Sequence, residues 1–310
     1  MHKIGIVGHT GMVGQELQKV LANHDKVEIV YRKNSTSEEG SLKECDLVFL
    51  ATRDEESMGF LSTAMVAGVK VIDMSGAYRL SVEDFEKWYG IKHTSSKYIN
   101  EAAYGLPAVY FDQIKDARLV ANPGCYPTAV VLALRPLRGL VWNDISIVAT
   151  SGNSGARREC DEISDDITYS YGRKHKHVPE IERYSGFKVD FTPIVLRSVF
   201  KGINANIRAD LSTDLKGVSD ESARQSIEKA IENEYCEDDR VFIVHDSADK
   251  QYGTKDVNDT HDMLIKVRVE NGRAYINVLI DNLMKGAASQ GVENMNIMLG
   301  IERLYGIITG

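Results

Sequence analysis

A cysteine that could act as a nucleophile lies in the heptapeptide NPGCYPT, residues 122–128. Pro123 and Gly124 predict a sharp turn, and the apolar run that follows predicts a helix beginning close to Cys125. A helix N-terminus stabilises a thiolate through its dipole, and its N–H groups stabilise the oxyanion formed when the thiolate attacks a carbonyl. Simple packing is the commoner role of a single cysteine, so this motif alone leaves both interpretations open.

Two histidines offer the acid–base chemistry that a thiolate nucleophile requires. His175 and His177 stand in HKHVPEI, and in an extended segment their spacing would direct both side chains to one side. Glu180 is near enough in the sequence to orient one of them. We favour His175 as the acid–base, although the sequence does not decide between the two. The alternatives are a metal site, for which we find no convincing third ligand, and a basic patch that attracts an anionic substrate.

The other three cysteines fit structural roles better. Cys45 directly precedes a predicted strand, and Cys160 and Cys236 stand in charged surroundings without a preceding tight turn. The four cysteines form no C-x-x-C pair, so we expect free thiols in a reducing compartment and no metal site.

The composition excludes several other classes of protein. The 310-residue chain has a net charge of −8, whereas a general nucleic-acid binder needs a basic face. It has no apolar run of the ~18 residues that span a bilayer. Its first residues, MHKIGIVG, lack the pattern of a signal peptide. We therefore expect a cytoplasmic protein with no nucleic-acid or membrane partner.

A glycine-rich loop near the N-terminus has the spacing of a dinucleotide-binding site. Gly8, Gly11 and Gly14 form G-x-x-G-x-x-G between a predicted strand at 3–7 and a predicted helix. The first glycine permits a tight turn, another lets the backbone approach a diphosphate, and the last lets helix and strand pack. A glycine-rich turn without a ligand is the alternative, and dinucleotide binding is the better interpretation.

The end of the second predicted strand distinguishes NAD from NADP. An NAD site usually has an acidic residue there, which binds the ribose 2′-hydroxyl. Glu28 lies too early in this strand, which ends at Arg32 and Lys33, with Ser35 or Thr36 as further donors. These residues suit a 2′-phosphate, so we predict NADP; ordinary solvated charges are the alternative.

The elements around these motifs indicate two domains. Strands and helices alternate over roughly the first 120 residues, which indicates a doubly wound, parallel α/β sheet. From about residue 125 to 285 the pattern changes to long extended segments and a hairpin whose turn is Asn271-Gly272. This pattern indicates an α+β domain with an antiparallel sheet that has one buried face.

The last segment of the chain is predicted to be helical, and the pattern does not assign it to either domain. Val292, Met295, Leu299 and Leu304 would form one apolar stripe along it.

Several of these motifs occur together in one known family, in the same order and over nearly the whole chain. They are GxxGxxG at 8–14, IDMSGAYRL at 72–80, YGLP at 104–107, NPGCYPT, SGNSGA, HKHVPEI and NLMKGAASQGVENMN at 282–296. NPGCYPT together with HKHVPEI is specific, whereas the glycine loop is not. On these motifs the chain resembles the semialdehyde dehydrogenase family.

The resemblance implies a Rossmann NADP-binding domain over 1–124, completed by a C-terminal helix within 286–310, and a catalytic and dimerisation domain over 125–285. It implies that Cys125 is the nucleophile and that the segment of His175 and His177 supplies the acid–base and binds substrate. The activity implied is NADPH-dependent reductive dephosphorylation of N-acetyl-γ-glutamyl phosphate to the semialdehyde in arginine biosynthesis. The partners implied are this acyl phosphate, inorganic phosphate, and further copies of the chain in a homodimer or homotetramer.

The glycine loop, the second strand and the family motifs together define candidate binding residues. Those proposed for the cofactor are Gly8, Thr10, Gly11, Met12, Val13, Gly14, Arg32, Lys33, Ser35, Ser75, Gly152, Ser154, Gly155 and Asn282. Those proposed for the substrate are Asn122, Ser151, Arg157, Arg158 and Lys285. Arg157 and Arg158 would offer forked donors to a phosphate or carboxylate.

The chain departs from the family pattern at Ala77, Ala108, Arg157 and Ser289. Close relatives act on aminoadipyl or aspartyl phosphates, so a reductase of one of these is an alternative. A non-catalytic NADP-binding regulatory protein is the alternative from another class.

Overall fold

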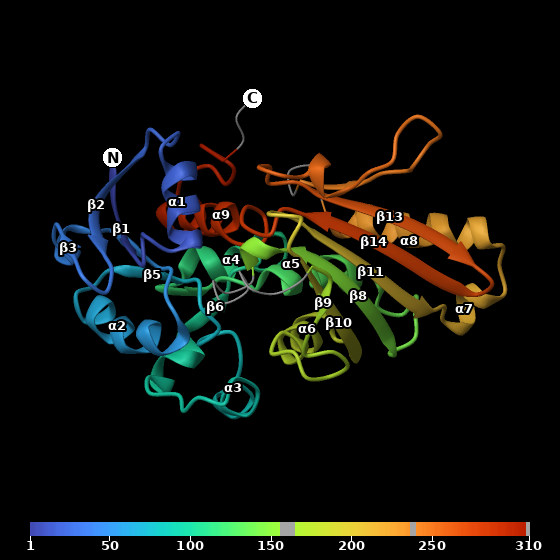
Figure 1. Ribbon diagram of the computed structural model, residues 1–310, viewed down its shortest axis with the longest axis horizontal. Coiled ribbons are helices and arrows are strands. Elements are labelled where there is room, and N and C mark those ends of the chain that lie inside the picture. The colour runs from blue at the N-terminus through green and yellow to red at the C-terminus, as the bar shows by residue number, and fades with distance from the viewer. Residues whose placement is uncertain (156–164, 236–239, 308–310) are drawn as a thin grey trace. The chain divides into compact units, whose positions relative to one another are not determined.

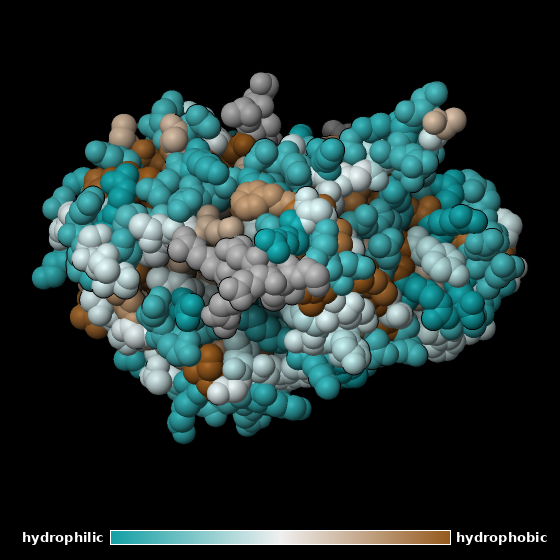
Figure 2. All heavy atoms as spheres, viewed as in Figure 1, coloured by the Kyte–Doolittle hydropathy of each residue, from teal (hydrophilic) through white to brown (hydrophobic). Residues whose placement is uncertain are grey.

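The computed structural model describes residues 1–155, 165–235 and 240–307 (Figure 1). The chain divides into two compact units, Met1–Gly124 with Gly286–Gly310, and Cys125–Lys285. Hydrophilic residues cover most of the face shown in Figure 2, with smaller hydrophobic areas between them. Among the described residues, no helix is both long and apolar enough to span a bilayer.

The first unit contains a sheet with the strand order β3-β2-β1-β4-β5-β7-β6. All neighbouring strands are parallel except β2 and β3. The chain leaves β1 toward β2 on one side and later returns to β4 on the other, so the end of β1 is the topological switch point at which such sheets bind ligands. The strands are β1 His2–Val7, β2 Val27–Lys33, β3 Glu38–Glu39, β4 Leu47–Leu50, β5 Lys70–Asp73, β6 Ala102–Tyr104 and β7 Leu119–Ala121.

The helices of the first unit include the C-terminal helix α9, which contacts α1 and α4 (Figure 1). The α-helices are α1 Met12–Leu21, α2 Asp54–Val66, α3 Val82–Tyr89, α4 Pro107–Asp116 and α9 Ala288–Leu299. Two short 3₁₀ helices are η1 Leu42–Glu44 and η2 Ser96–Glu101.

Val292 and Met295 of the predicted apolar stripe are buried, but the burial is not limited to one stripe and Leu304 is not part of the helix. Every residue of α9 from Ala288 to Met298 is buried, and the helix ends at Gly300 in the left-handed conformation, before Leu304. A helix buried on all sides has no face toward solvent, so its polar side chains need hydrogen-bond partners inside the protein.

The second unit contains a sheet with the strand order β12-β13-β14-β11-β8-β10-β9. The predicted antiparallel sheet is confirmed in outline, but β8 with β10 and β12 with β13 are parallel pairs. The predicted hairpin joins β13 and β14, and Asn271 and Gly272 both have the positive φ that its two-residue turn requires. The strands are β8 Ile145–Gly152, β9 Ile167–Thr168, β10 Val189–Leu196, β11 Ile203–Asp210, β12 Val241–Ile243, β13 Met263–Glu270 and β14 Arg273–Ile280.

The helices of the second unit pack on its sheet: α5 contacts β11 and β14, α6 contacts β10, and α8 contacts β13. Along β8 and β14 the buried side chains alternate with exposed ones, which include Val148 and Tyr275. The helices are α5 Cys125–Leu134, α6 Val178–Ser185, α7 Thr213–Lys216 and α8 Asp220–Glu234, with 3₁₀ helices η3 Arg135–Leu137, η4 Asn153–Gly155 and η7 Thr254–Asp256.

Candidate active site

Cys125 is the first residue of α5, which confirms the helix start predicted from the sequence. Its side chain is partly exposed, whereas Cys45 is buried in the apolar core of the first unit. Burial raises the pKa of the Cys45 thiol to about 11, and the nearby Asp46 and Glu44 carboxylates act in the same direction. Cys45 is therefore a packed thiol, and Cys125 has the position of a nucleophile. Cys160 and Cys236 lie outside the described residues.

His175 and His177 lie close together, although their segment is not extended. The chain forms turns here, and His177 has helical backbone angles because it directly precedes α6, which has Pro179 in its first turn. The two imidazole rings still approach to 4.7 Å between centroids, nearly perpendicular to each other. The backbone N–H of His177 donates to Nδ1 of His175 at 3.1 Å. In this arrangement the proton of neutral His175 is on Nε2.

Aromatic side chains surround the two histidines. Tyr126, which follows Cys125 on α5, lies 5.8 Å from the His175 ring and 5.9 Å from the His177 ring between centroids. Phe191 of β10 and Tyr169 lie 5.2 and 5.5 Å from the His175 ring. Burial lowers the pKa of His175 to about 4, and the positive charge of Lys176 adds to this effect. His175 is therefore neutral at neutral pH.

Glu180 is fully buried in the first turn of α6, three residues after His177. A carboxylate near a helix N-terminus is stabilised by the helix dipole. The catalytic candidates of the second unit thus come from the starts of two helices that pack against each other, α5 and α6.

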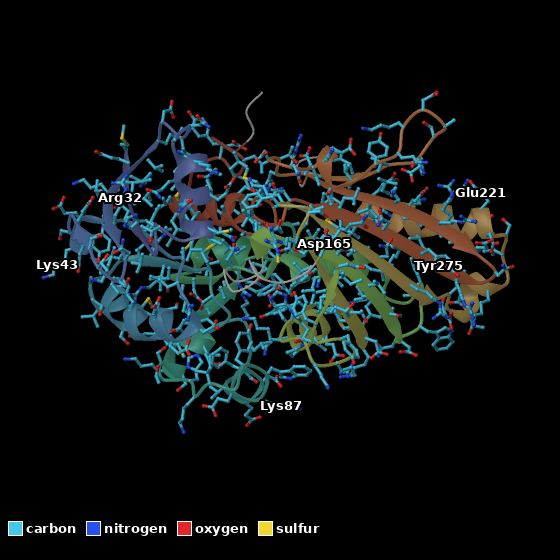
Figure 3. The ribbon with its side chains drawn as sticks, in the orientation of Figure 1. Arg32, Lys43, Lys87, Asp165, Glu221 and Tyr275 are labelled. Atoms are coloured by element: carbon cyan, nitrogen blue, oxygen red, sulfur yellow. The ribbon has the colours of Figure 1, made fainter. Side chains whose placement is uncertain are left out.

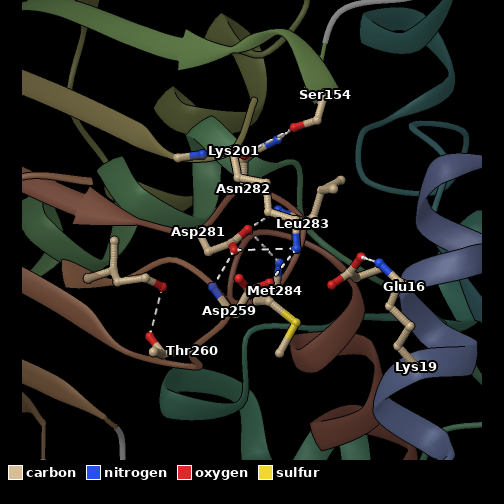
Figure 4. Close-up of polar contacts among 12 residues, drawn as sticks. Glu16, Lys19, Ser154, Lys201, Asp259, Thr260, Asp281, Asn282, Leu283 and Met284 are labelled. Carbon is tan, nitrogen blue, oxygen red and sulfur yellow. Dashed lines mark hydrogen bonds and ion pairs between the residues drawn. The ribbon is translucent and has the colours of Figure 1, made fainter. Parts of the chain in front are cut away.

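The small-residue loop that follows β8 is held by hydrogen bonds within the second unit. Asn282 donates from Nδ2 to Ser154 Oγ at 3.0 Å (Figure 4). Its Oδ1 accepts from the backbone N–H of Gly202 at 2.7 Å. A β-carbon on Gly152 would lie 2.4 Å from the carbonyl oxygen of Phe200, so only glycine fits there. The side chains of Ser154 and Asn282 are therefore hydrogen-bonded to each other.

Ser151 and Gly155 complete the described part of this loop. Ser151 is buried and its Oγ donates to the Gly152 carbonyl at 3.1 Å, whereas Gly155 is exposed. Arg157 and Arg158, predicted to bind the substrate, lie outside the described residues.

Three other predicted binding residues are buried and contact groups of their own unit. Lys285 is 2% exposed and its Nζ lies 3.1 Å from His261 Nε2. Ser75 donates to Asp73 at 2.8 Å. Asn122 is 1% exposed and accepts a hydrogen bond from Asn294 at 2.9 Å. These contacts support the surrounding loops.

The glycine loop of the first unit has two positions that only glycine can occupy. Gly8 has a φ of +84°, and a β-carbon on it would lie 2.3 Å from the Ala51 carbonyl oxygen. A β-carbon on Gly14 would lie 2.2 Å from the Gly8 carbonyl oxygen, so this glycine lets helix and strand pack. The roles predicted for the first and last glycines in turn formation and packing are confirmed.

The start of α1 leaves backbone donors for an anion. Gly11 is the N-cap and has no side chain with which to cap the first N–H groups of the helix. Thr10, Gly11 and Met12 are exposed, and Val13 is half-buried. These residues therefore fit a dinucleotide, whose diphosphate would accept from the N–H groups of this helix start.

The two cations at the end of β2 differ in their partners. Lys33 forms an ion pair with Glu38, which also accepts from Tyr31. Arg32, which is labelled in Figure 3, instead donates from Nε to Gln18 Oε1 of α1 at 3.3 Å. Arg32 is therefore the better candidate to bind a 2′-phosphate, because the charge of Lys33 is already balanced. Ser35 is exposed in the following turn.

Sequence reasoning missed the aromatic partners of the histidines and the groups that hold Asn122. Tyr126 belongs to the quoted motif NPGCYPT. Asn294 and Arg79, which donates to the Asn122 carbonyl oxygen, belong to two other quoted motifs, so the motifs could have indicated all three residues. Tyr169 and Phe191 had none, because only the packing of β9 and β10 brings them near His175.

Two family patterns match this chain. The dimerisation domain of semialdehyde dehydrogenase matches residues 125–282, and its NAD binding domain matches residues 3–42 and 32–117. The chain belongs to the semialdehyde dehydrogenase family, as the resemblance of its motifs predicted.

Two relatives within this family are similar to the chain over nearly their whole length. The N-acetyl-gamma-glutamyl-phosphate reductase of Thiobacillus denitrificans is 36% identical over 97% of this chain and 96% of its own. The protein of the same name from Ruthia magnifica is 34% identical over 99% of this chain and 98% of its own. Both alignments span essentially the whole of each protein.

Solved structures share the fold. Aspartate semialdehyde dehydrogenase II from Vibrio cholerae, complexed with ASA, has a TM-score of 0.72 and 17% identity over 97% of this chain and 98% of its own. Aspartate semialdehyde dehydrogenase from Candida albicans, solved with NADP, has a TM-score of 0.71 and 16% identity over 97% and 99%.

Proposed function

We propose that this protein reduces N-acetyl-γ-glutamyl phosphate to N-acetylglutamate 5-semialdehyde with NADPH, in arginine biosynthesis. The observation that carries the proposal is the full-length similarity to reductases of that name. The thiol at the start of α5, with two histidines at the start of the neighbouring α6, supports it because covalent acyl transfer needs a nucleophile and a proton carrier.

In this reaction the Cys125 thiolate attacks the acyl carbon and forms a C–S bond. The tetrahedral intermediate then breaks the bond to the phosphate oxygen, and phosphate leaves with the electron pair. When bound, NADPH supplies a hydride to the carbonyl carbon of the thioester. The C–S bond then breaks, which releases the aldehyde and returns the electron pair to Cys125. The N–H groups at the start of α5 stabilise both the thiolate and the oxyanions.

We assign the proton transfers to His177, which departs from the preference for His175 stated from the sequence. Nδ1 of His175 accepts from the His177 backbone and Nε2 carries the proton, so His175 gains a second proton only by losing that bond. The low pKa of His175, which burial causes, also disfavours a second proton on this ring. His175 is then a neutral Nε2–H donor, suited to the carbonyl oxygen of the substrate, and Glu180 orients the segment.

The proposed cofactor is NADP rather than NAD, and Arg32 is the residue proposed to distinguish them. We expect Arg32→Ala to raise the Kd for NADPH by about 10-fold or more, because a charge-assisted hydrogen bond is lost, and to leave the Kd for NADH within about twofold. Fluorescence titration of each nucleotide measures both values. Lys33→Ala is the matched control with a smaller expected effect, since Lys33 is paired with Glu38. Equal weakening of NADPH and NADH by Arg32→Ala would contradict the assignment.

We propose that two copies of the chain pair through the open face of the second sheet. The second unit matches a dimerisation domain, and α5 and α8 cover one face of its sheet. Side chains of the strands line a groove of about 430 Å³ that includes Val148, Asn206 and Tyr275, the last of which is labelled in Figure 3. An exposed patch with a valine and a tyrosine suits a protein partner. Light scattering that gives the mass of a single chain would rule this out.

A cytoplasmic location is proposed on the chemistry of the site. Cys125 must remain a thiol to act as a nucleophile, and a reducing compartment keeps it so. Cell fractionation that recovers the protein outside the cytoplasm would refute this location.

A substrate panel tests the proposed function. The assay runs in reverse, with phosphate, NADP⁺ and one of three semialdehydes, derived from N-acetylglutamate, aminoadipate or aspartate. We expect kcat/KM for the acetylglutamate semialdehyde to exceed the other two by about 100-fold or more, as expected of a site that hydrogen-bonds the acetamido group. Preference for another semialdehyde would change the substrate, and no turnover of any would favour a non-catalytic regulatory protein.

A further inference from the structure

Asn122, three residues before Cys125, is held from several directions within the first unit. Its Oδ1 accepts from Asn294 Nδ2 at 2.9 Å, and its Nδ2 lies 3.4 Å from the Ala287 carbonyl oxygen. Its own carbonyl oxygen accepts from Arg79 Nε at 2.7 Å. The side chains of Asn122, Asn294 and Arg79 are all buried. Residues distant in the sequence thus converge on the segment that leads into α5.

Asn294 contributes two hydrogen bonds to this arrangement. Its Nδ2 donates to Asn122 Oδ1 and also to the carbonyl oxygen of Gly105, at 2.9 Å in each case. A β-carbon on Gly105 would lie 2.6 Å from Asn294 Nδ2, so the backbone at Gly105 approaches the amide closely. The amide therefore ties the YGLP motif and the NPGC turn to α9.

We propose that Asn294 is a positioning residue for the nucleophile: its amide holds Asn122 so that the turn Pro123-Gly124 delivers Cys125 in a fixed orientation. The inference rests on the role proposed for Cys125. Between Asn122 and Cys125 the chain has only a proline and a glycine, so the orientation of the thiol depends on the two ends of this short turn. Residues 126–134 of α5 are buried and hold one end within the second unit, and Asn294 with Arg79 holds the other end within the first unit.

Removal of the Asn294 amide leaves two buried acceptors, Asn122 Oδ1 and the Gly105 carbonyl, without these donors. The Arg79 bond to the Asn122 carbonyl remains, so the turn is loosened and not lost. A displacement of about 1 Å at a reacting atom lowers the rate by about 100-fold. We therefore expect slower chemistry from a chain that still folds.

The same helix supplies a matched control. Asn296 is also fully buried, and its Nδ2 donates to two carbonyl oxygens, those of Arg303 and Tyr305, at 3.1 and 2.9 Å. Its Oδ1 lies 3.0 Å from His24 Nε2. Asn296 thus has the same side chain, burial and number of donated bonds, but it holds the C-terminal segment. Asn294→Ala and Asn296→Ala should lower thermal stability to a similar degree.

The experiment compares the two variants with the parent in three measurements: kcat in the reverse assay, the rate of Cys125 alkylation by iodoacetamide, and the Kd for NADPH. We expect Asn294→Ala to lower kcat by about 10- to 100-fold and to slow alkylation, with the Kd for NADPH within about twofold. Asn296→Ala should keep kcat and alkylation within about twofold. If Asn294→Ala does not fold, Asn294→Asp, which has nearly the same shape but no amide donor, takes its place.

The outcomes separate this inference from the proposed function. Equal losses of kcat in the two variants, or no loss in either, would overturn the positioning role while Cys125→Ser stays inactive. Activity retained by Cys125→Ser would instead remove the proposed nucleophile, and with it the basis of the inference.

Discussion

Cys125→Ser is expected to lower kcat for reductive dephosphorylation by about 1,000-fold or more. A serine hydroxyl at the start of α5 ionises far less readily than a thiol, so little nucleophile forms at neutral pH. An oxygen ester would also accept hydride less readily and would release an alkoxide, a poorer leaving group than a thiolate. The substitution is nearly isosteric at a partly exposed position, so the fold should be retained.

The matched control for this experiment is Cys45→Ser. Cys45 is buried in the core of the first unit, and burial raises its pKa to about 11, so it is not a nucleophile at neutral pH. We expect this variant to lose some stability and to keep its kcat. Steady-state kinetics, with mass spectrometry of the alkylated parent protein to locate the reactive thiol, distinguishes the two cysteines. Near-normal turnover by Cys125→Ser would show that the thioester route is wrong.

His177→Gln is expected to lower kcat by about 100- to 10,000-fold, the usual contribution of a general acid–base. His175→Gln should have a smaller effect, because a glutamine amide replaces one hydrogen-bond donor with another. The pH profile provides the sharper test: His177→Gln should lose the pH dependence of kcat/KM that comes from the general acid–base, and His175→Gln should keep it. The reverse pattern would restore His175 as the acid–base.

The pKa of His175 also predicts how stability depends on pH. Its value of about 4 in the folded protein lies below the ~6.5 of an unfolded chain, so the unfolded state binds more protons between these values. Its contribution to stability is complete above about pH 6.5 and is lost as the pH falls to 4, by up to about 3 kcal/mol. The free energy of unfolding of His175→Gln, measured by urea titration, should lack this loss.

The pH dependence of stability that Asp73 contributes has the opposite sign to that of His175. The free energies of unfolding of the parent and of His175→Gln must therefore be compared at each pH. Burial raises the pKa of Asp73 to about 6, and its contribution to stability is therefore present below pH 3.8 and lost as the pH rises through 6. The difference between the parent and His175→Gln cancels this contribution. A difference that does not change between pH 4 and 6.5 would contradict the low pKa of His175.

The features that the sequence predicted well depend on neighbouring residues. The helix start at Cys125 follows from Pro123-Gly124 and an apolar run, and the hairpin turn follows from Asn271-Gly272. Gly14 could be assigned because a β-carbon there would meet Gly8 and His9 within one strand–turn–helix unit, and Gly8 because its turn needs a positive φ. The family was predictable because its motifs combine such local signals in a fixed order.

Features that depend on distant contacts could not be predicted in this way. The H-x-H segment folds as a turn because α6 begins directly after it, and the pKa of His175 is low because the segment is buried against Tyr126 and Phe191. The sequence predicts only an apolar stripe on the C-terminal helix, because periodicity cannot show that α1 and α4 both pack on it.

By itself, the sequence therefore determined the reactive chemistry: a thiol at a helix start, two histidines, and a glycine loop for a dinucleotide. These depend on residue type and on spacing over a few residues. Only the tertiary structure decided how that chemistry is held and tuned. The bond from Asn294 to Asn122 joins positions 172 residues apart, and the neutral state of His175 is caused by desolvation, which arises only when the chain packs.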